Sequence, residues 1–310
     1  MLKYKLCAMR RCLSLLCACV LFAAGCSSSK PKGSGAPGGE ARQGQAELFI
    51  MDADGSGARR LTTNKALDGS PTMSPDGTTI AFATDREFDS QIYVINADGT
   101  NEHRLSTSKG NNVRPAFSPD GKHIVFQSSR NAQKDLYVMD ADGANERRLT
   151  NTADDEVSPA WSPDGRQIVY ALGTGKPGSV RSRFELWIMD AGGTNKRQLT
   201  QTAMSAAYPT FSPDGAQVAF METITKEIYV VGADGSGLKQ ISDDPTNDDI
   251  TPAWFPGDRI LFTRGSGIFH DVYSMKSDGS DVVKITNTVA DEFIPAWSFD
   301  GTKIVFARDA

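Results

Sequence analysis

The chain has 310 residues, of which 33 are Lys or Arg and 38 are Asp or Glu, so its formal net charge is −5 at pH 7. All five cysteines lie in the first 26 residues, which excludes a disulfide, a zinc–cysteine cluster or a thiol nucleophile from the rest of the chain. The same 26 residues carry four cations and no Asp or Glu, and without them the net charge is −9. This acidic body argues against nucleic acid or an anionic membrane as the main partner.

The first 25 residues have the pattern of an export signal, with four basic residues ahead of an apolar stretch at residues 12–24. That stretch is shorter than the roughly 20 apolar residues that a membrane-spanning helix needs. It ends in Ala23-Ala24-Gly25-Cys26, which resembles the processing site of bacterial lipoproteins, whose cysteine is acylated and becomes the first mature residue. We therefore expect lipidation, as by palmitate, at Cys26. Ala23 stands where that motif usually has Leu, and ordinary cleavage near Ala24 is the alternative.

Residues 26–45 are expected to form a flexible tether. After Cys26 they contain Ser, Gly, Pro, Lys and Gln but no large apolar side chain. A Gly/Ser-type chain of this length has a root-mean-square span of about 25 Å. In proteobacterial lipoproteins a residue other than Asp after the cysteine implies the outer membrane, and Ser27 follows here. We expect an outer-membrane lipoprotein that faces the periplasm, with a cell-surface or secreted protein as the alternative.

Residues 46–310 contain six copies of one cassette. Its first half is a turn that reads Ser-Pro-Asp-Gly in four copies and is altered in two, at residues 255–258 and 298–301, and it follows an aromatic residue in all copies but the first. Successive turns are 44, 44, 50, 43 and 43 residues apart. Its second half is an apolar strand, another Asp-Gly turn and a Leu/Ile-Thr/Ser pair such as Leu149-Thr150. A period of this length is typical of propeller blades.

Each cassette predicts four short strands. In the third copy the first three are expected at residues 158–162, 167–171 and 186–189, while residues 147–150 supply the fourth strand of the blade before. Proline presets the turn and glycine accepts its left-handed position, and no part of the body has helical periodicity. The sequence therefore predicts an all-β, six-bladed β-propeller with four antiparallel strands per blade, over residues 46–310.

The body begins and ends in the middle of a blade rather than at a blade boundary. The body begins with the third and fourth strands of a blade, at residues 47–51 and 59–62, and ends with the first and second, at residues 294–297 and 303–307. The last blade is therefore expected to combine strands from both termini. Such closure removes two sheet edges that would otherwise invite aggregation.

The run Ser158-Pro159-Ala160-Trp161-Ser162-Pro163-Asp164-Gly165, with the strands and turns around it, resembles the WD40-like Pro-Asp repeat of TolB-like propellers. The resemblance covers essentially all of residues 46–310. It implies a role in envelope organisation or transport, such as docking to a peptidoglycan-associated protein. The same repeat resembles propellers of prolyl-oligopeptidase-type peptidases and of oligogalacturonate lyases. TolB itself has an α/β domain ahead of its propeller and is soluble, whereas this chain has only the short tether and a lipoprotein signal.

The candidate binding site is a ring of acidic residues. Three residues before the proline of each first strand stand Asp68, Asn112, Glu156, Ala206, Asp249 and Glu292, and four of these six positions are acidic. Equivalent positions in a ring converge on its axis, so we expect these side chains at one mouth of the channel. Like charges held close together raise one another's pKa or recruit a cation. A basic peptide, a protein partner or a divalent ion could bind there; the alternative is that the residues are solvated loop acids or cap the first strand.

Other motifs point to architecture rather than chemistry. The Asp-x-Asp-Gly runs lack the further oxygen ligands of a calcium loop, and the aromatic residue of each first strand suits packing between blades. The three histidines have no metal-like spacing, and there is no Gly-x-Ser-x-Gly motif of a serine hydrolase. The longest insertion, at residues 173–184, is a candidate partner contact or a neutral surface loop.

We therefore expect a monomeric, non-catalytic propeller that needs no cofactor and binds a protein or peptide through Asp68, Asn112, Glu156, Asp249 and Glu292. The alternative is an enzyme that processes a saccharide or peptide at the channel mouth. An enzyme needs groups of unlike chemistry around one reacting atom, whereas a ring of one sign suits a binding surface.

Overall fold

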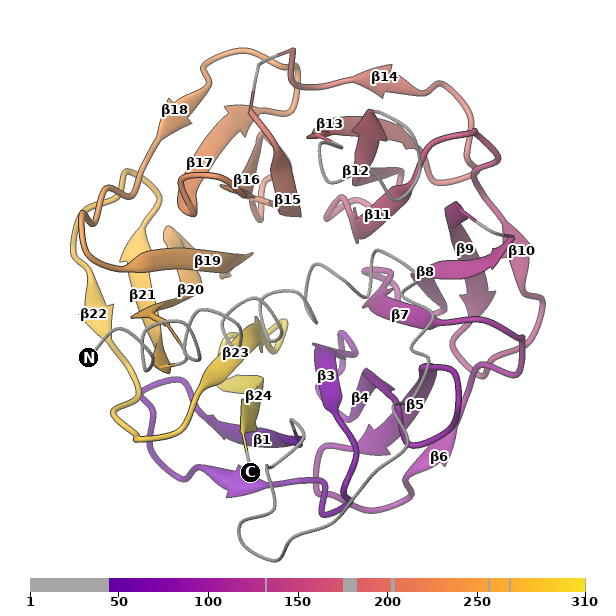
Figure 1. Ribbon diagram of the computed structural model, residues 1–310, viewed down its shortest axis with the longest axis horizontal. Coiled ribbons are helices and arrows are strands. Elements are labelled where there is room, and N and C mark those ends of the chain that lie inside the picture. Colours follow the sequence, from indigo (N-terminus) through magenta and orange to yellow (C-terminus); the bar gives the residue numbers. More distant parts are fainter. Residues whose placement is uncertain are drawn as a thin grey trace, which may run out of the picture.

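The computed structural model describes residues 45–131, 133–174, 183–201, 204–255, 257–267 and 269–309. Over these residues, 24 strands form six four-stranded antiparallel sheets around a central axis (Figure 1). The predicted six-bladed all-β propeller is confirmed. Within the described ranges, no helix is long and apolar enough to cross a membrane. The predicted signal, Cys26 and all but the last residue of the tether lie outside them.

Five blades are contiguous in sequence. Blade 1 consists of β3 (Asp68–Met73), β4 (Thr79–Thr84), β5 (Gln91–Asn96) and β6 (His103–Arg104). Blade 2 consists of β7 (Asn112–Phe117), β8 (His123–Asn131), β9 (Gln133–Asp140) and β10 (Arg147–Arg148). Blade 3 consists of β11 (Glu156–Trp161), β12 (Gln167–Thr174), β13 (Arg183–Asp190) and β14 (Arg197–Gln198). Blade 4 consists of β15 (Ala206–Phe211), β16 (Gln217–Glu222), β17 (Glu227–Gly232) and β18 (Lys239–Gln240). Blade 5 consists of β19 (Asp248–Trp254), β20 (Arg259–Ser266), β21 (Phe269–Lys276) and β22 (Val283–Lys284).

Blade 6 is built from both ends of the body, as predicted. Its strands are β23 (Glu292–Trp297), β24 (Lys303–Asp309), β1 (Ala46–Asp52) and β2 (Arg59–Arg60), in the order β2-β1-β24-β23. β1 and β24 pair antiparallel without interruption from Ala46↔Asp309 to Asp52↔Lys303. In Figure 1 the indigo and yellow ends of the chain share this sheet. The ring is therefore closed by backbone hydrogen bonds.

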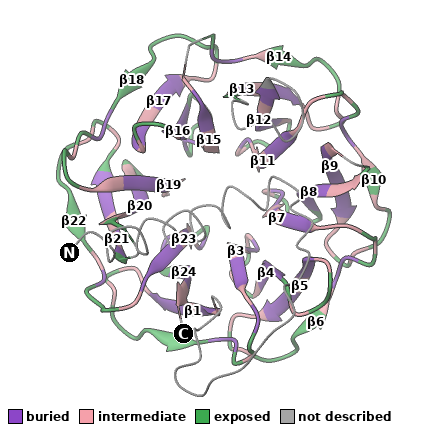
Figure 2. Ribbon diagram, in the orientation of Figure 1, coloured by how far each residue is buried: buried purple, intermediate pink, exposed green. Residues whose placement is uncertain are grey.

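The core lies between neighbouring blades. For example, Val94 and Leu105 of blade 1 belong to one buried cluster with Phe117, Phe126 and Met139 of blade 2. Buried residues accordingly follow the inner strands, while the outermost strand of each blade is mostly exposed (Figure 2). The aromatic residue that recurs in the first strands packs into these clusters, as expected; Phe117 and Phe211 are buried and Trp161, Trp254 and Trp297 lie at cluster edges.

The two repeated turns hold the blades in place. In the first, Ser74 Oγ donates to Asp76 Oδ1 at 2.6 Å and the Thr78 amide donates to the same oxygen at 3.0 Å, and these bonds lower the pKa of Asp76. In the second, Gly143 has φ +88° and a Cβ placed there would lie 2.9 Å from the Leu105 carbonyl oxygen of the preceding blade. The Asp-Gly glycine is thus needed both for the turn and for close packing between blades.

The first and fourth strands differ from their predicted bounds. β11 begins at Glu156 rather than at residue 158. A bulge with Ser158 at φ 53° interrupts the ladder, and Glu156 and Val157 pair with β12 on the N-terminal side of this bulge. The ladder of β10 ends at Arg148, where residues 149 and 150 were also expected. Thr150 instead receives a hydrogen bond from the Leu136 amide through its side-chain hydroxyl, at 2.8 Å.

Candidate functional site

The propeller has two unlike faces. One, the turn face, carries the short hairpin turns after the first and third strands of each blade. The other, the loop face, carries the connections between blades and those between second and third strands. Its described segments are residues 61–67, 85–90, 105–111, 149–155, 199–201, 204–205, 223–226, 241–247, 267 and 285–291. The start of the described chain is also on the loop face, because Ala46 pairs with Asp309 and forms a bridge with Leu67.

All five predicted ring residues lie at the loop-face ends of the innermost strands, but they are not exposed. Each is 0% exposed: Asp68, Asn112, Glu156, Asp249 and Glu292. They are strand residues covered by the preceding connection, as where Thr152 Oγ1 donates to Glu156 Oε1 at 2.5 Å. The alternative that these residues are solvated loop acids is therefore wrong. Partner or cation binding by these residues is not tested by this placement.

Arginines on or just after the second strand of the same blade pair with three of the four ring acids and with Asn112. Arg264 Nε and Nη2 donate to the two carboxylate oxygens of Asp249 at 2.6 Å each. Arg308 Nε and Nη2 donate to Glu292 Oε1 at 3.0 and 2.6 Å. The equivalent pairs are Arg86 with Asp68 at 3.3 Å and Arg130 with the Asn112 side-chain oxygen at 3.0 Å.

The arginines themselves are oriented by aromatic rings. The Arg130 guanidinium lies 3.9 Å from the centre of the Tyr137 ring, and Arg308 lies 4.3 Å from that of Phe49. Cation–π contacts of this kind favour Arg over Lys. Sequence reasoning missed these arginines, although Arg264 and Arg308 face the ring acids across the strand pair and could have been found from the register.

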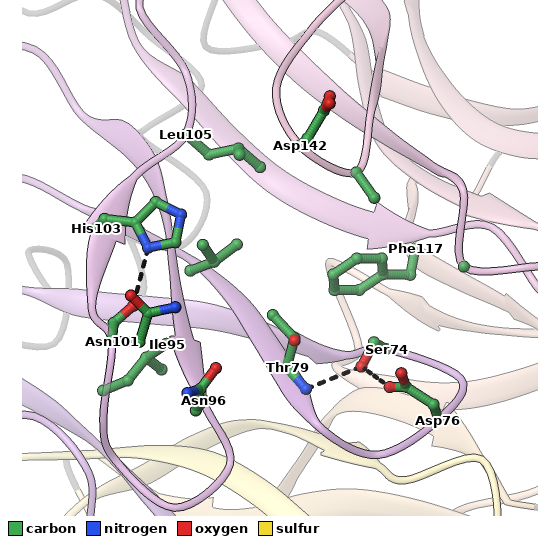
Figure 3. Close-up of a pocket in the computed structure, with 13 residues that line it drawn as sticks. Ser74, Asp76, Thr79, Ile95, Asn96, Asn101, His103, Leu105, Phe117 and Asp142 are labelled. Carbon is green, nitrogen blue, oxygen red and sulfur yellow. Dashed lines mark hydrogen bonds between the residues drawn. The ribbon is translucent and has the colours of Figure 1, made fainter.

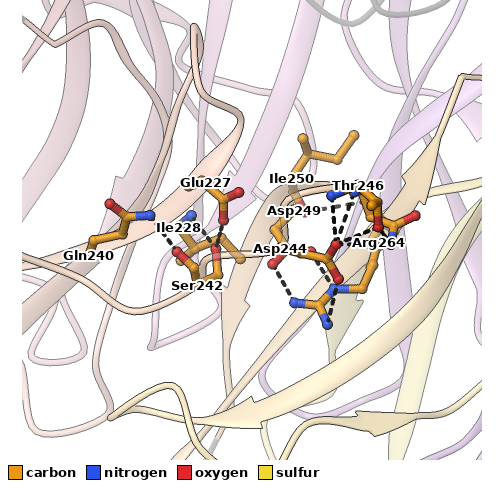
Figure 4. Close-up of polar contacts among 11 residues, drawn as sticks. Glu227, Ile228, Gln240, Ser242, Asp244, Thr246, Asp249, Ile250 and Arg264 are labelled. Carbon is orange, nitrogen blue, oxygen red and sulfur yellow. Dashed lines mark hydrogen bonds and ion pairs between the residues drawn. The ribbon is translucent and has the colours of Figure 1, made fainter.

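Hydroxyl groups of the Leu/Ile-Thr/Ser pairs extend this network (Figure 4). In blade 4, Ser242 accepts a hydrogen bond from the Ile228 amide at 2.8 Å and donates to Glu227 Oε2 at 2.5 Å. Across the blade boundary, Thr286 of blade 5 donates to Glu292 of blade 6. The ring acids therefore help to join successive blades.

Glu156 is the exception among the acids. Its Oε2 and the Oδ2 of the nearby Asp135 are both buried without a hydrogen-bond partner. Burial raises the pKa of Glu156 to about 7, and the Asp135 charge adds to this shift. Glu156 is thus the ring residue whose charge can change near neutral pH.

Two long side chains meet across the channel. Arg114 on β7 donates through Nη2 to the Tyr208 hydroxyl on β15 at 2.6 Å, and its guanidinium lies 4.2 Å from the centre of the Tyr208 ring. Blade 3 separates their blades, so the contact spans the central opening (Figure 1). Both residues have a positive φ at the bulge of the inner strand. The sequence offered no signal for this pair beyond the residues themselves.

The loop face also presents apolar side chains to solvent. Phe88, Val289, Ile224 and Phe269 are 104%, 93%, 69% and 62% exposed, and all four lie on or beside its connections. The other exposed large apolar residues, at most 47% exposed, lie on the turn-face side or on β22: Leu238, Val282, Val283 and Phe299. They share a face but lie on blades 1, 4 and 5 and on the connection from blade 5 to blade 6, so Phe88 and Ile224 are on opposite sides of the ring.

The histidines do not converge. His270 bonds Asp291 through Nδ1 at 2.8 Å, His123 bonds Asp140 at 3.1 Å, and His103 bonds the Asn101 carbonyl at 2.9 Å. They belong to blades 5, 2 and 1. Within the ranges that the structure describes, no group of three or more His, Cys, Asp or Glu side chains is placed to hold a metal ion.

Comparisons with known proteins agree with this architecture. The family model of the TolB beta propeller domain, PD40, matches residues 24–114, 102–178 and 173–309. A solved structure from Agrobacterium tumefaciens described as a TolB has a TM-score of 0.74 at 22% identity, with 86% of this chain and 99% of that chain covered. TolB from Acinetobacter baumannii has a TM-score of 0.63 at 18% identity over 86% of this chain, which spans 64% of the TolB chain. Oligogalacturonate lyase from Vibrio parahaemolyticus has a TM-score of 0.57 at 13% identity, covering 86% of this chain and 98% of the lyase.

No curated protein matches the sequence. The chain belongs to the TolB beta-propeller domain family.

Proposed function

We propose that this protein is a non-catalytic, lipid-anchored propeller of the bacterial outer membrane that binds a protein or peptide partner in the periplasm through its loop face. Its role would be one of envelope organisation or transport. The observation that carries the proposal is that, among the residues that the structure describes, the four most exposed large apolar side chains all lie on that face: Phe88, Val289, Ile224 and Phe269. Aromatic residues such as Phe88 and Phe269 are enriched in the cores of protein interfaces.

The buried ring supports the binding surface from below. Asp249 and Glu292 each hold an arginine of their own blade at 2.6 Å, and both start or nearly start an inner strand directly after a connection of the loop face. Glu292 also accepts a hydrogen bond from Thr288, next to Val289, at 3.3 Å. Arg264 also contacts Asp244 in the connection before β19 at 3.4 Å. These contacts hold the two connections against the strands. Neutralising the ring acids would therefore disturb the fold, so binding is better tested at the exposed side chains.

The position of the tether relates the anchor to this face. The described chain starts on the loop face, beside Leu67. A chain lipidated at Cys26 would then hold the loop face toward the membrane at a root-mean-square distance of about 25 Å. The partner we propose is accordingly one that lies at the membrane surface.

The binding test compares matched apolar truncations. Wild type, the double variant Phe88→Ser/Phe269→Ser and the control Phe299→Ser on the turn face would each be crosslinked in envelope preparations, and captured proteins quantified. We expect at least one captured protein to be lost with the double variant and retained with the control. Equal capture by all three forms would contradict a loop-face site. Binding of the purified wild type to lipid vesicles, lost in the double variant, would assign the apolar residues to the membrane instead.

The anchor has its own test. We expect metabolic labelling with palmitate to mark the wild type and not a Cys26→Ser variant, and the labelled protein to fractionate with outer membranes. A wild type that is cleaved but unlabelled would indicate ordinary secretion.

The enzyme alternative rests on the likeness to oligogalacturonate lyase, which at 13% identity concerns the fold alone. In this chain the three histidines occupy three blades and bond to separate partners. Incubating the purified protein with oligogalacturonate or envelope glycans should give no chain cleavage. Cleavage that is lost when the loop face is altered would favour the enzyme.

A further inference from the structure

A cavity of about 300 Å³ opens on the turn face between blades 1 and 2. Its rim is polar, with the turn aspartates Asp76 and Asp142 on opposite blades, and its floor is apolar, with Leu105 and Phe117 (Figure 3). His103 lines the cavity on the blade 1 side. This site is on the face opposite the proposed partner surface and does not depend on it.

Two equivalent boundaries between blades are spanned by an arginine. Arg59, on β2 of blade 6, donates to the carbonyl oxygens of Ala97 and Asp98 in the second turn of blade 1, with the Nη1–Asp98 distance at 3.2 Å. Arg197, on β14 of blade 3, donates through Nη2 to the Ala233 carbonyl in the corresponding turn of blade 4 at 2.6 Å. A guanidinium thus connects the fourth strand of one blade to the second turn of the next.

His103 holds the position of these arginines at the boundary between blades 1 and 2. It lies on β6, as Arg59 lies on β2 and Arg197 on β14, each the first residue of a fourth strand. Its Nδ1 bonds the Asn101 carbonyl of its own blade at 2.9 Å, and its side chain is too short to reach across as an arginine does. The turn it would contact, which includes Ala141 and Asp142, instead lines the cavity.

The walls suit a guanidinium group. The turn aspartates are held as acceptors: Asp76 accepts from the Ser74 hydroxyl and the Thr78 amide, and Asp142 accepts from the Ala144 amide at 2.9 Å. Hydrogen bonding lowers the pKa of Asp76, so its carboxylate stays charged at neutral pH. A planar, weakly hydrated cation can place its edge on such acceptors and its face on the apolar floor, which a compact ammonium does less well.

We propose that the cavity between blades 1 and 2 binds a guanidinium group, supplied either by an arginine side chain of a partner or by a small guanidinium compound. The group would take the place that Arg59 and Arg197 fill at their boundaries. The volume of about 300 Å³ is at the lower end of ligand pockets and leaves space for the rest of an arginine side chain.

The first measurement follows the Gly121 amide, which lines the cavity, by NMR of the folded protein during titration with methylguanidinium. We expect a saturable shift with a dissociation constant on the order of 1 mM, as suits so small a ligand. Methylammonium, as the matched cation, should bind at least fivefold more weakly. A shift that never saturates, or equal binding of the two cations, would overturn the proposal.

Exchange of residues between boundaries gives the second measurement. His103→Arg should abolish the saturable shift, because its own guanidinium fills the cavity. Arg59→His should create a second site, seen as a saturable shift of the Gly99 amide in the turn that Arg59 contacts. Unfolding midpoints would verify that both variants are folded. Retained binding in His103→Arg would refute the assignment.

A short peptide with one arginine distinguishes the two sources of the ligand. Binding tenfold or more tighter than that of methylguanidinium indicates a side chain presented by a partner, whereas equal affinity indicates a free small compound. A peptide with lysine in place of arginine is the control, and it should bind no better than methylammonium.

Discussion

The Glu156→Gln substitution tests the electrostatics of the buried ring. Glu156 is 0% exposed, has no arginine partner among its hydrogen bonds, and has one carboxylate oxygen without a partner. Burial raises its pKa from 4.5 to about 7. At about 1.4 kcal/mol per pKa unit, this corresponds to about 3 kcal/mol of stability that the wild type loses when Glu156 must ionise.

The sign of the pH dependence follows from the raised pKa. Below about pH 4.5 the carboxyl is protonated in both folded and unfolded chains, and its contribution to stability is fully present. As the pH rises through about 7, the unfolded chain gains from ionisation before the folded chain does, and that contribution is lost. Glutamine stays neutral and can still accept the hydrogen bond from Thr152. The gain in stability of the variant over wild type should therefore be about 3 kcal/mol larger at about pH 8.5 than at about pH 4.

The assay is urea unfolding of wild type and variant at both pH values, followed by tryptophan fluorescence. Glu292→Gln is the matched control, because Glu292 holds the equivalent position and is bonded to Arg308 at 2.6 Å. Removing that charge leaves a guanidinium poorly paired and should lower stability by about 2–3 kcal/mol at neutral pH. A Glu156→Gln effect that is the same at both pH values would refute the argument that Glu156 is protonated in the folded chain.

Three further tests concern the architecture. Phe306→Ala should destabilise the protein by about 3–5 kcal/mol in thermal unfolding, because its fully buried side chain belongs to the closing blade; a cost below 1 kcal/mol would mean that closure contributes little. Gly279→Ala should cost several kcal/mol more than Gly237→Ala, since both have positive φ but only the former would place Cβ 2.1 Å from a carbonyl of the preceding blade; equal unfolding midpoints would contradict that contact. A double-mutant cycle with Arg114→Met and Tyr208→Phe should give a coupling of about 1 kcal/mol for their 2.6 Å hydrogen bond; zero coupling would mean that the pair does not bridge the channel in solution.

The architecture could be predicted because it is repeated and local. The Asp76 turn and its four bonded copies make hydrogen bonds within five residues. Their recurrence therefore identifies the hairpins, and the spacing of the six cassettes gives the ring. The phase of the repeat likewise predicted the pairing of β1 with β24. The burial of the ring residues at the start of the inner strands could not be predicted. It accompanies a bulge in β11, with Ser158 at a positive φ, and this bulge depends on packing around the axis rather than on local propensity.

The ring of acids illustrates why a repeated charge is weak evidence of a binding site. Four acids in equivalent positions predicted a negative channel mouth, but each position also faces the adjacent strand of its own blade, where Arg264 and Arg308 stand opposite Asp249 and Glu292. A repeat can place compensating residues as regularly as it places charges, and three of the four ring acids pair with an arginine of their own blade. The features that repetition does not explain are those that occur once: the apolar Phe88 on its connection, the Arg114–Tyr208 bridge, and the histidine His103 at a position where three other blades have arginine. Function specific to this protein should therefore be sought where one blade departs from the other five.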